Sequence, residues 1–312
     1  MHAFVNAIAA RRRHLTLAAV LSGIAATRSG PLRSPQQSLV IENRSGLRLL
    51  VAEQSADPIV RLIRPGLPSS DRSIEILFPE HVTVRRQGAA TAEQLYLHRP
   101  GSEGRRPEWR RTGSALEYER RLRGDVQLLA RATLENDGLR IRYEFHNRSE
   151  IAYDMVTAVT DPRLMSDLHD VRLERTYVHR ADGFQLLGGE TPERLAMPLD
   201  QWLPARYLAS FTWPVPAERV QRLNGITHYY ASRSVDRPFI ATLSADRSWV
   251  IATLARDPGN VWSNPELTCQ HADPQRPLPA RGVAVLEVKI LLLRGSLDDV
   301  LRAVDKQRDS LR

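Results

Sequence analysis

Cysteine is nearly absent from this sequence of 312 residues, in which Cys269 is the only one. A single cysteine excludes an internal disulfide bond and any zinc site built from several cysteines. The histidines show neither the His-x-His nor the His-Glu-x-x-His spacing of metal sites, and no glycine-rich phosphate loop or Gly-x-Ser-x-Gly nucleophile elbow is present. The sequence therefore predicts no metal and no cofactor, and it predicts Cys269 as a small buried apolar residue rather than a nucleophile.

Lysine is almost as scarce, since only Lys289 and Lys306 accompany the many arginines. The formal net charge is +8 and the pI is about 10.1. The arginines are spread among glutamates along strand-like segments, and no helix-turn-helix, zinc-finger or RNA-recognition pattern accompanies them. We therefore expect no nucleic-acid partner, and we attribute the positive charge to a solvated surface.

The N-terminal apolar run is too short to span a bilayer comfortably. It covers residues 15–26, follows Arg11-Arg12-Arg13 and ends in small residues. This layout predicts a signal peptide at residues 1–26 of the Sec or twin-arginine type, followed by a flexible lead-in at 27–38. We expect a periplasmic or secreted protein without stable membrane insertion after signal cleavage; a cytoplasmic location is the alternative.

From residue 39 onward the sequence is dominated by alternating, strand-like segments. The clearest predicted hairpin joins residues 126–135 to residues 139–146 through Asn136-Asp137-Gly138, since Asp-Gly is a strong signal for a tight turn. In its second strand, the apolar residues fall on one face and the charged residues on the other. Further strands are expected at 73–78 and 82–86, at 238–244 and 249–255, and over 282–293.

A convincing helix pattern appears only at the end of the chain. Ser296 can cap it, acidic residues occupy its first turn, and Leu297, Val300, Leu301 and Val304 form its apolar stripe. Residues 160–235 are less regular and contain many prolines, as binding loops often do. The sequence thus predicts an all-β protein, a single domain at 39–312 that forms a large antiparallel β-supersandwich with a short C-terminal helix.

One C-terminal stretch resembles a known superfamily. The motif consists of Val261-Trp262-Ser263-Asn264-Pro265, then Cys269-Gln270-His271, then residues 277–282 and a long strand. It resembles the C-terminal part of the galactose mutarotase-like superfamily, most of all its hexose-6-phosphate mutarotase branch, and residues 138–149 resemble a segment of the same family. The resemblance implies a β-supersandwich whose concave polar face binds saccharides.

The departure from the family pattern concerns its general base. The family has a glutamate at the end of its Cys-x-Glu motif, where this sequence has His271. Histidine can act as a base near neutral pH, so His271 is the first catalytic candidate. Glu266 could take the missing role from the preceding loop, and His228, beside two tyrosines, is the third candidate, as an acid or as a residue that holds the ligand.

Other residues are candidates for binding the substrate. Trp262 could stack on a sugar ring, as could Trp202 and Trp213, although most tryptophans are core residues. The remaining substrate-binding candidates are His146, His179, Asn264, Arg206 and Arg233, the two arginines because a guanidinium can hold a carboxylate or phosphate.

The sequence supports two readings of function. The first is an exported protein that binds a mono- or oligosaccharide, with acidic sugars among the candidates because of the positive charge, and that acts as an epimerase-like isomerase or a lyase. The second is a non-catalytic saccharide-binding or structural β-sandwich protein. The same fold serves several reactions, so the resemblance alone does not choose between them.

Overall fold

The computed structural model describes residues 39–52, 57–95, 106–122, 125–190, 207–212, 217–223, 226–263 and 267–312. These residues belong to one compact unit, Ser38–Arg312. The predicted signal peptide and lead-in lie outside the described residues. Within the described part of the chain, no helix has the length and apolar character needed to cross a membrane.

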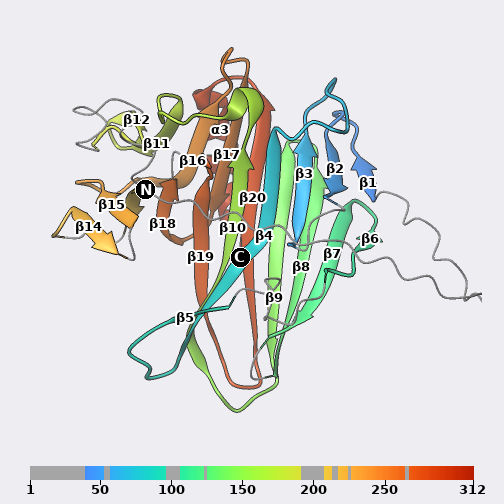
Figure 1. The fold of residues 1–312 in the computed structure, drawn as a ribbon, viewed down its shortest axis with the longest axis vertical. Coiled ribbons are helices and arrows are strands. Elements are labelled where there is room, and N and C mark those ends of the chain that lie inside the picture. The colour runs from blue at the N-terminus through green and yellow to red at the C-terminus, as the bar shows by residue number, and fades with distance from the viewer. Residues whose placement is uncertain are drawn as a thin grey trace, which may run out of the picture. The chain divides into compact units, whose positions relative to one another are not determined.

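Among the described residues, one sheet contains eleven strands, and Figure 1 shows its central strands side by side. Their spatial order is β1-β2-β3-β4-β10-β19-β18-β13-β15-β14, with β5 paired to β4. The strands are β1 (Val40–Glu42), β2 (Arg48–Val51), β3 (Ile59–Ile63), β4 (Ile74–Arg86), β5 (Glu93–Leu95), β10 (Tyr153–Leu164), β13 (Tyr207–Thr212), β14 (Val220–Leu223), β15 (Ile226–Tyr230), β18 (Pro258–Ser263) and β19 (His271–Leu278).

The other sheet has nine strands in the order β12-β11-β16-β17-β20-β9-β8-β7-β6. They are β6 (Arg110–Thr112), β7 (Ala115–Arg121), β8 (Val126–Glu135), β9 (Gly138–Asn147), β11 (Thr176–Arg180), β12 (Gly183–Leu186), β16 (Arg237–Leu243), β17 (Trp249–Ala255) and β20 (Val283–Arg294). The helical elements are η2 (Ser166–Leu168), α3 (Leu297–Gln307) and η3 (Arg308–Ser310). Nearly all strand pairs are antiparallel; β13 and β15 run parallel. The predicted fold class is confirmed.

The main core lies between the two sheets. Ile76 and Val156 of the eleven-stranded sheet pack in one cluster with Tyr143 and Leu286 of the nine-stranded sheet, and all four are fully buried. Because side chains alternate along a strand, the residues between these point to the opposite face of each sheet. On the nine-stranded sheet, Val300 and Val304 of α3 cover part of that outer face.

The local predictions agree with the structure in most places. The hairpin at Asn136-Asp137-Gly138 joins β8 to β9, and Ser296 caps α3 in a capping box with Asp299. One prediction is wrong: the two strands expected at 73–78 and 82–86 are a single strand, β4. It passes through Pro79 opposite a register shift in β10 between Val159 and Asp161. A proline without an N–H group is tolerated at such an irregularity.

Glu190 links the end of the β12 segment to the chain that follows β15. Its carboxylate accepts hydrogen bonds from Arg180 (2.5 Å) and from the backbone of Ser232 (2.9 Å), and it also pairs with Arg219. Burial alone would raise the pKa of Glu190, but the bonds from Arg180 and Ser232 outweigh it and lower this pKa to about 2. A carboxylate with a depressed pKa stabilises the fold above its unfolded pKa, and that contribution disappears as the pH falls.

We therefore expect Glu190→Gln to lower Tm at neutral pH. The Tm gap between wild type and variant should persist down to about pH 4.5 and shrink as the pH falls toward 2, because both proteins then carry an uncharged side chain. Thermal unfolding at several pH values measures the gap, with Glu174→Gln, an exposed site, as the control. A gap that does not change with pH would contradict the assignment.

Candidate functional site

Polar side chains lie on both faces of the eleven-stranded sheet at its centre. Gln270 bonds to Thr253 (3.0 Å) and Thr242 (2.9 Å) of the nine-stranded sheet, so it lies between the sheets. Thr160 does the same through Tyr143 (2.7 Å). By alternation, the next residues along the chain, His271 and Asp161, lie on the opposite face, which we call the outward face.

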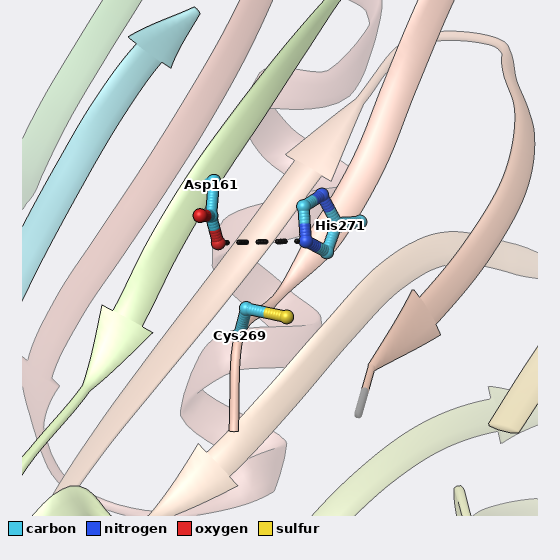
Figure 2. Close-up of side chains that lie close together, drawn as sticks. All are labelled: Asp161, Cys269 and His271. Atoms are coloured by element: carbon cyan, nitrogen blue, oxygen red, sulfur yellow. Dashed lines mark ion pairs between the residues drawn. The ribbon is translucent and has the colours of Figure 1, made fainter. Parts of the chain in front are cut away.

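His271 and Asp161 come together because β19 pairs with β10. Nε2 of His271 lies 3.5 Å from Oδ1 of Asp161 (Figure 2). Nδ1 of His271 lies 3.6 Å from Oδ2 of Asp273. Trp262 stands directly opposite His271 on β18 and stacks on its imidazole ring, with centroids 3.6 Å apart and planes 1° apart. His271 and Asp161 are each 1% exposed, so this is a buried site.

Burial and neighbouring charges act on both members of this pair. Burial raises the pKa of the Asp161 carboxyl, although His271 and Arg163 oppose the shift. Burial by itself lowers the pKa of His271, but negative charge on Cys269 and Asp273 outweighs it and holds that pKa well above its usual range. The pair is therefore an acid and a base in contact, in a position where water does not screen their charges.

Further ionisable groups surround the pair. Nε of Arg163 donates to Oδ2 of Asp161 at 2.6 Å. Nδ1 of His81 lies 3.7 Å from the carboxylate of Glu80 on β4. The pKa of Glu80 is lowered first by the nearby His81 and then by the charge of His271 and Arg163, against the effect of burial. Cys269 is buried, as predicted. However, its Sγ lies within 4.8 Å of ligand atoms of both Asp161 and His271 rather than among apolar side chains only.

His228 lies on the same outward face but farther along the sheet. Its neighbour Tyr229 packs into the core between the sheets together with Val261, so His228 and Tyr230 point outward, as Trp262 does. The His228 and Tyr230 rings stack with centroids 6.0 Å apart. Backbone pairing places Tyr230 three strands from His271, which corresponds to about 14 Å at the usual strand spacing. Burial lowers the pKa of His228, which favours the neutral ring.

The other predicted histidines belong to the nine-stranded sheet. His146 on β9 bonds to Glu144 (2.7 Å), and His179 on β11 bonds to Asp236 (2.7 Å). Exposed Arg233 pairs with Asp182 at 2.9 Å. The structure does not bring His146, His179 or Arg233 to the pair of His271 and Asp161, and their role in binding stays a prediction. Five further predicted or weighed residues lie outside the described part of the chain: Trp202, Arg206, Trp213, Asn264 and Glu266.

Sequence reasoning missed the residues that surround His271. Asp161 and Arg163 lie far from the recognised motif in the sequence. Asp273 lies within the motif region but was not singled out. One signal could have pointed to Asp161, because an aspartate followed by Pro162 interrupts an otherwise β-rich segment. Such an interruption often marks a bulge that redirects a side chain.

Comparisons with known proteins give likeness at the level of fold. No family model and no curated protein matches the sequence. The solved structure of Slr1438 protein from Synechocystis sp. PCC 6803 is similar with a TM-score of 0.50 and 11% identity, over 84% of this chain and 97% of that chain. At 11% identity this similarity concerns the fold alone.

Two further solved structures are similar to the chain at lower TM-scores. A galactose mutarotase-like protein from Lactobacillus casei has 13% identity and a TM-score of 0.45 over 82% of this chain and 100% of that chain. A putative aldose 1-epimerase from Escherichia coli has 13% identity and a TM-score of 0.41 over 83% of this chain and 100% of that chain.

Proposed function

We propose that this protein binds a saccharide on the outward face of the eleven-stranded sheet. The observation that carries the proposal is the register of β19, β18 and β15, which sets His271, Trp262 and Tyr230 in one row on that face, with His228 beside them. Aromatic rings with polar edges, next to imidazoles, can pack against the C–H groups of a sugar and bond its hydroxyls. The resemblance of residues 261–282 to a sugar-binding superfamily supports the same ligand class.

His228 and Tyr230 are more accessible to a ligand in this row than His271 is. Both side chains are partly buried, whereas His271 is covered. A neutral His228 can both donate and accept a hydrogen bond, which suits a hydroxyl group. Trp262 and Tyr230 lie two strands apart, about 10 Å at the usual strand spacing, which is wider than one sugar ring and suits an oligosaccharide.

A second candidate function is catalysis on the same saccharide, as an isomerase or a lyase with His271 as the base. One observation favours it: the Asp161 carboxylate lies 3.5 Å from Nε2 of His271, where it could orient the imidazole. Such chemistry also requires the substrate to reach a ring that is 1% exposed and stacked against Trp262. It requires a neutral imidazole as well, whereas the effect of burial on His271 is outweighed by the negative charge of Cys269 and Asp273, which raises its pKa and favours the protonated ring. Binding without catalysis requires no such opening, and for this reason we place it first.

A thermal-shift screen tests the proposal. The full chain is heated with neutral, phosphorylated and uronic sugars and with short oligosaccharides, beside Tyr230→Ala and His271→Ala. We expect one sugar class to raise the Tm of the wild type and to act more weakly on Tyr230→Ala, because ligand binding to the folded state stabilises it. If a sugar raised the Tm of Tyr230→Ala as much as that of the wild type, the ligand would bind elsewhere than along this row. A shift in no sugar class would count against the proposal.

Export of the protein is a separate part of this proposal. It rests on the signal-peptide layout of residues 1–26 alone. Fractionation of cells that express the full chain tests it: we expect a shortened mature form outside the cytoplasm, and a full-length cytoplasmic product would contradict it.

A further inference from the structure

Three potential metal ligands of different chemistry meet at the start of β19. A carboxylate oxygen of Asp161, Sγ of Cys269 and a ring nitrogen of His271 lie within 4.8 Å of one another. Asp161 comes from β10. Cys269 and His271 are the neighbours in sequence of Gln270, whose side chain bonds to the other sheet. Figure 2 shows the carboxylate facing the imidazole, with the thiol close to both.

One oxygen of Asp161 lacks a partner that burial would ordinarily require. Oδ2 accepts a hydrogen bond from Arg163 at 2.6 Å, but Oδ1 is buried and has no hydrogen-bond partner. A buried acceptor without a partner is costly, and native structures seldom contain one without a reason. Oδ1 is also the atom that faces Nε2 of His271, at 3.5 Å.

The spacing and the donor set match those of zinc sites. Zinc binds thiolate, imidazole and carboxylate at about 2.0–2.3 Å, so two ligand atoms around a tetrahedral ion lie roughly 3.3–3.7 Å apart. The distance of 3.5 Å between Oδ1 and Nε2 falls in this range. The positive ion would also neutralise a buried carboxylate and a buried thiolate, which water does not solvate here.

The surrounding residues match the outer shell of such a site. A ligating histidine usually donates its other ring N–H to a carboxylate, which fixes the ring orientation. Nδ1 of His271 has Asp273 on that side, 3.6 Å away, which is close but longer than a hydrogen bond. Asp273 is itself fixed by the backbone N–H of Thr160 at 3.2 Å. Arg163 holds the second oxygen of Asp161 in the same way.

We propose that Asp161, Cys269 and His271 form a binding site for a divalent transition-metal ion of the zinc and cobalt class. Three protein ligands leave a fourth position for another donor, as in catalytic rather than closed structural sites. The inference goes beyond saccharide binding and does not depend on it. It excludes His271 as a base, because the ion would occupy the lone pair on Nε2.

Metal titration of the full chain tests this inference. After treatment with a chelator and its removal, the protein is titrated with Zn²⁺ in competition with a chromophoric chelator, and separately with Co²⁺. We expect one equivalent of zinc per chain, and with cobalt an absorption band from sulfur-to-metal charge transfer. That band is specific without any mutation, because Cys269 is the only cysteine.

Variants then identify the ligands. Asp161→Asn and Cys269→Ser should each weaken zinc binding by at least about tenfold, since they remove a direct ligand or its charge. His179→Gln is the matched control, because His179 contacts a carboxylate, Asp236, outside the cluster. The control should bind zinc as the wild type does.

Three outcomes would overturn the proposal: no bound zinc, no cobalt–sulfur band, or zinc affinity unchanged in Cys269→Ser and Asp161→Asn. Should a variant fail to fold, the wild-type cobalt spectrum still decides. The sugar screen is run with chelator and again with Zn²⁺, so a missing metal site and a missing saccharide site give different results.

Discussion

Gly138→Ala is expected to destabilise the fold by more than about 3 kcal/mol, because it combines backbone strain with overpacking. Gly138 has φ +145°, a conformation that L side chains rarely adopt. A Cβ at this position would lie 2.0 Å from the carbonyl oxygen of Ile290 on β20, which belongs to a backbone that cannot rotate away. Denaturant unfolding of the purified variant measures the loss.

Gly113→Ala separates the two causes. Gly113 also has a positive φ, +60°, but nothing lies within 4 Å of its Cβ position. Its substitution should therefore cost only the conformational term, about 1 kcal/mol. Equal losses of unfolding free energy in the two variants would contradict the close approach of the Ile290 carbonyl to Gly138.

Lys289→Met is expected to cost about 3 kcal/mol, the lower end of the range for breaking a buried ion pair. Lys289 is fully buried, and its Nζ contacts the carboxylates of Glu135 and Asp137. Burial alone would raise the pKa values of both acids, but Lys289 outweighs it and lowers them. Without the ammonium group, two neighbouring carboxylates would keep their charge with less compensation. Their partial exposure is the reason for expecting the lower end of the range.

The chain provides its own control for this substitution. Lys306 is the only other lysine and lies exposed on α3, so Lys306→Met should change the free energy of unfolding by less than about 0.5 kcal/mol. Adding Glu135→Gln to Lys289→Met should recover part of the loss, because one of the uncompensated charges is then removed. Equal stability of Lys289→Met and wild type in urea would show that the ammonium contributes nothing net.

Local features of the fold could be predicted from the sequence, whereas contacts between distant strands could not. The turn at Asn136-Asp137-Gly138 and the alternation in β9 depend on neighbours in the chain, so they were predicted correctly. The contact of Gly138 with β20 and the burial of Lys289 depend on strand pairing across about 150 residues, which local patterns do not encode. β4 was predicted as two strands on either side of Pro79, whereas the partner β10 accommodates the proline with a register shift.

The candidate site was predicted in part. The prediction came from the motif at residues 261–282 and not from the alternation of polar and apolar residues along the strands. The motif correctly drew attention to the start of β19, where His271 lies, and to Trp262 beside it. It did not indicate Asp161, which the pairing of β10 with β19 brings close to His271. It also did not indicate that the thiol of Cys269 lies near both of these side chains. A residue pattern that lacks metal spacing along the chain can still form a ligand set when distant strands meet.

Trp262 also has a different environment from the one expected of a sugar-stacking residue. It was predicted as a candidate for stacking on a sugar ring, but one face of its indole is occupied by the imidazole of His271. A saccharide could therefore use only its other face or its edge. This arrangement shifts the expected contacts along the row toward His228 and Tyr230.

The central claim is that a saccharide binds along this row, and calorimetric titration with the sugar class selected by the thermal-shift screen tests it most directly. We predict one binding site per chain, with affinity reduced at least about tenfold in the double variant His228→Ala/Tyr230→Ala, equivalent to about 1.4 kcal/mol. Lys306→Ala, at an exposed position of α3 on the other sheet, should bind as the wild type does. Equal affinity of the double variant and the wild type, or no heat of binding with any sugar, would contradict the account.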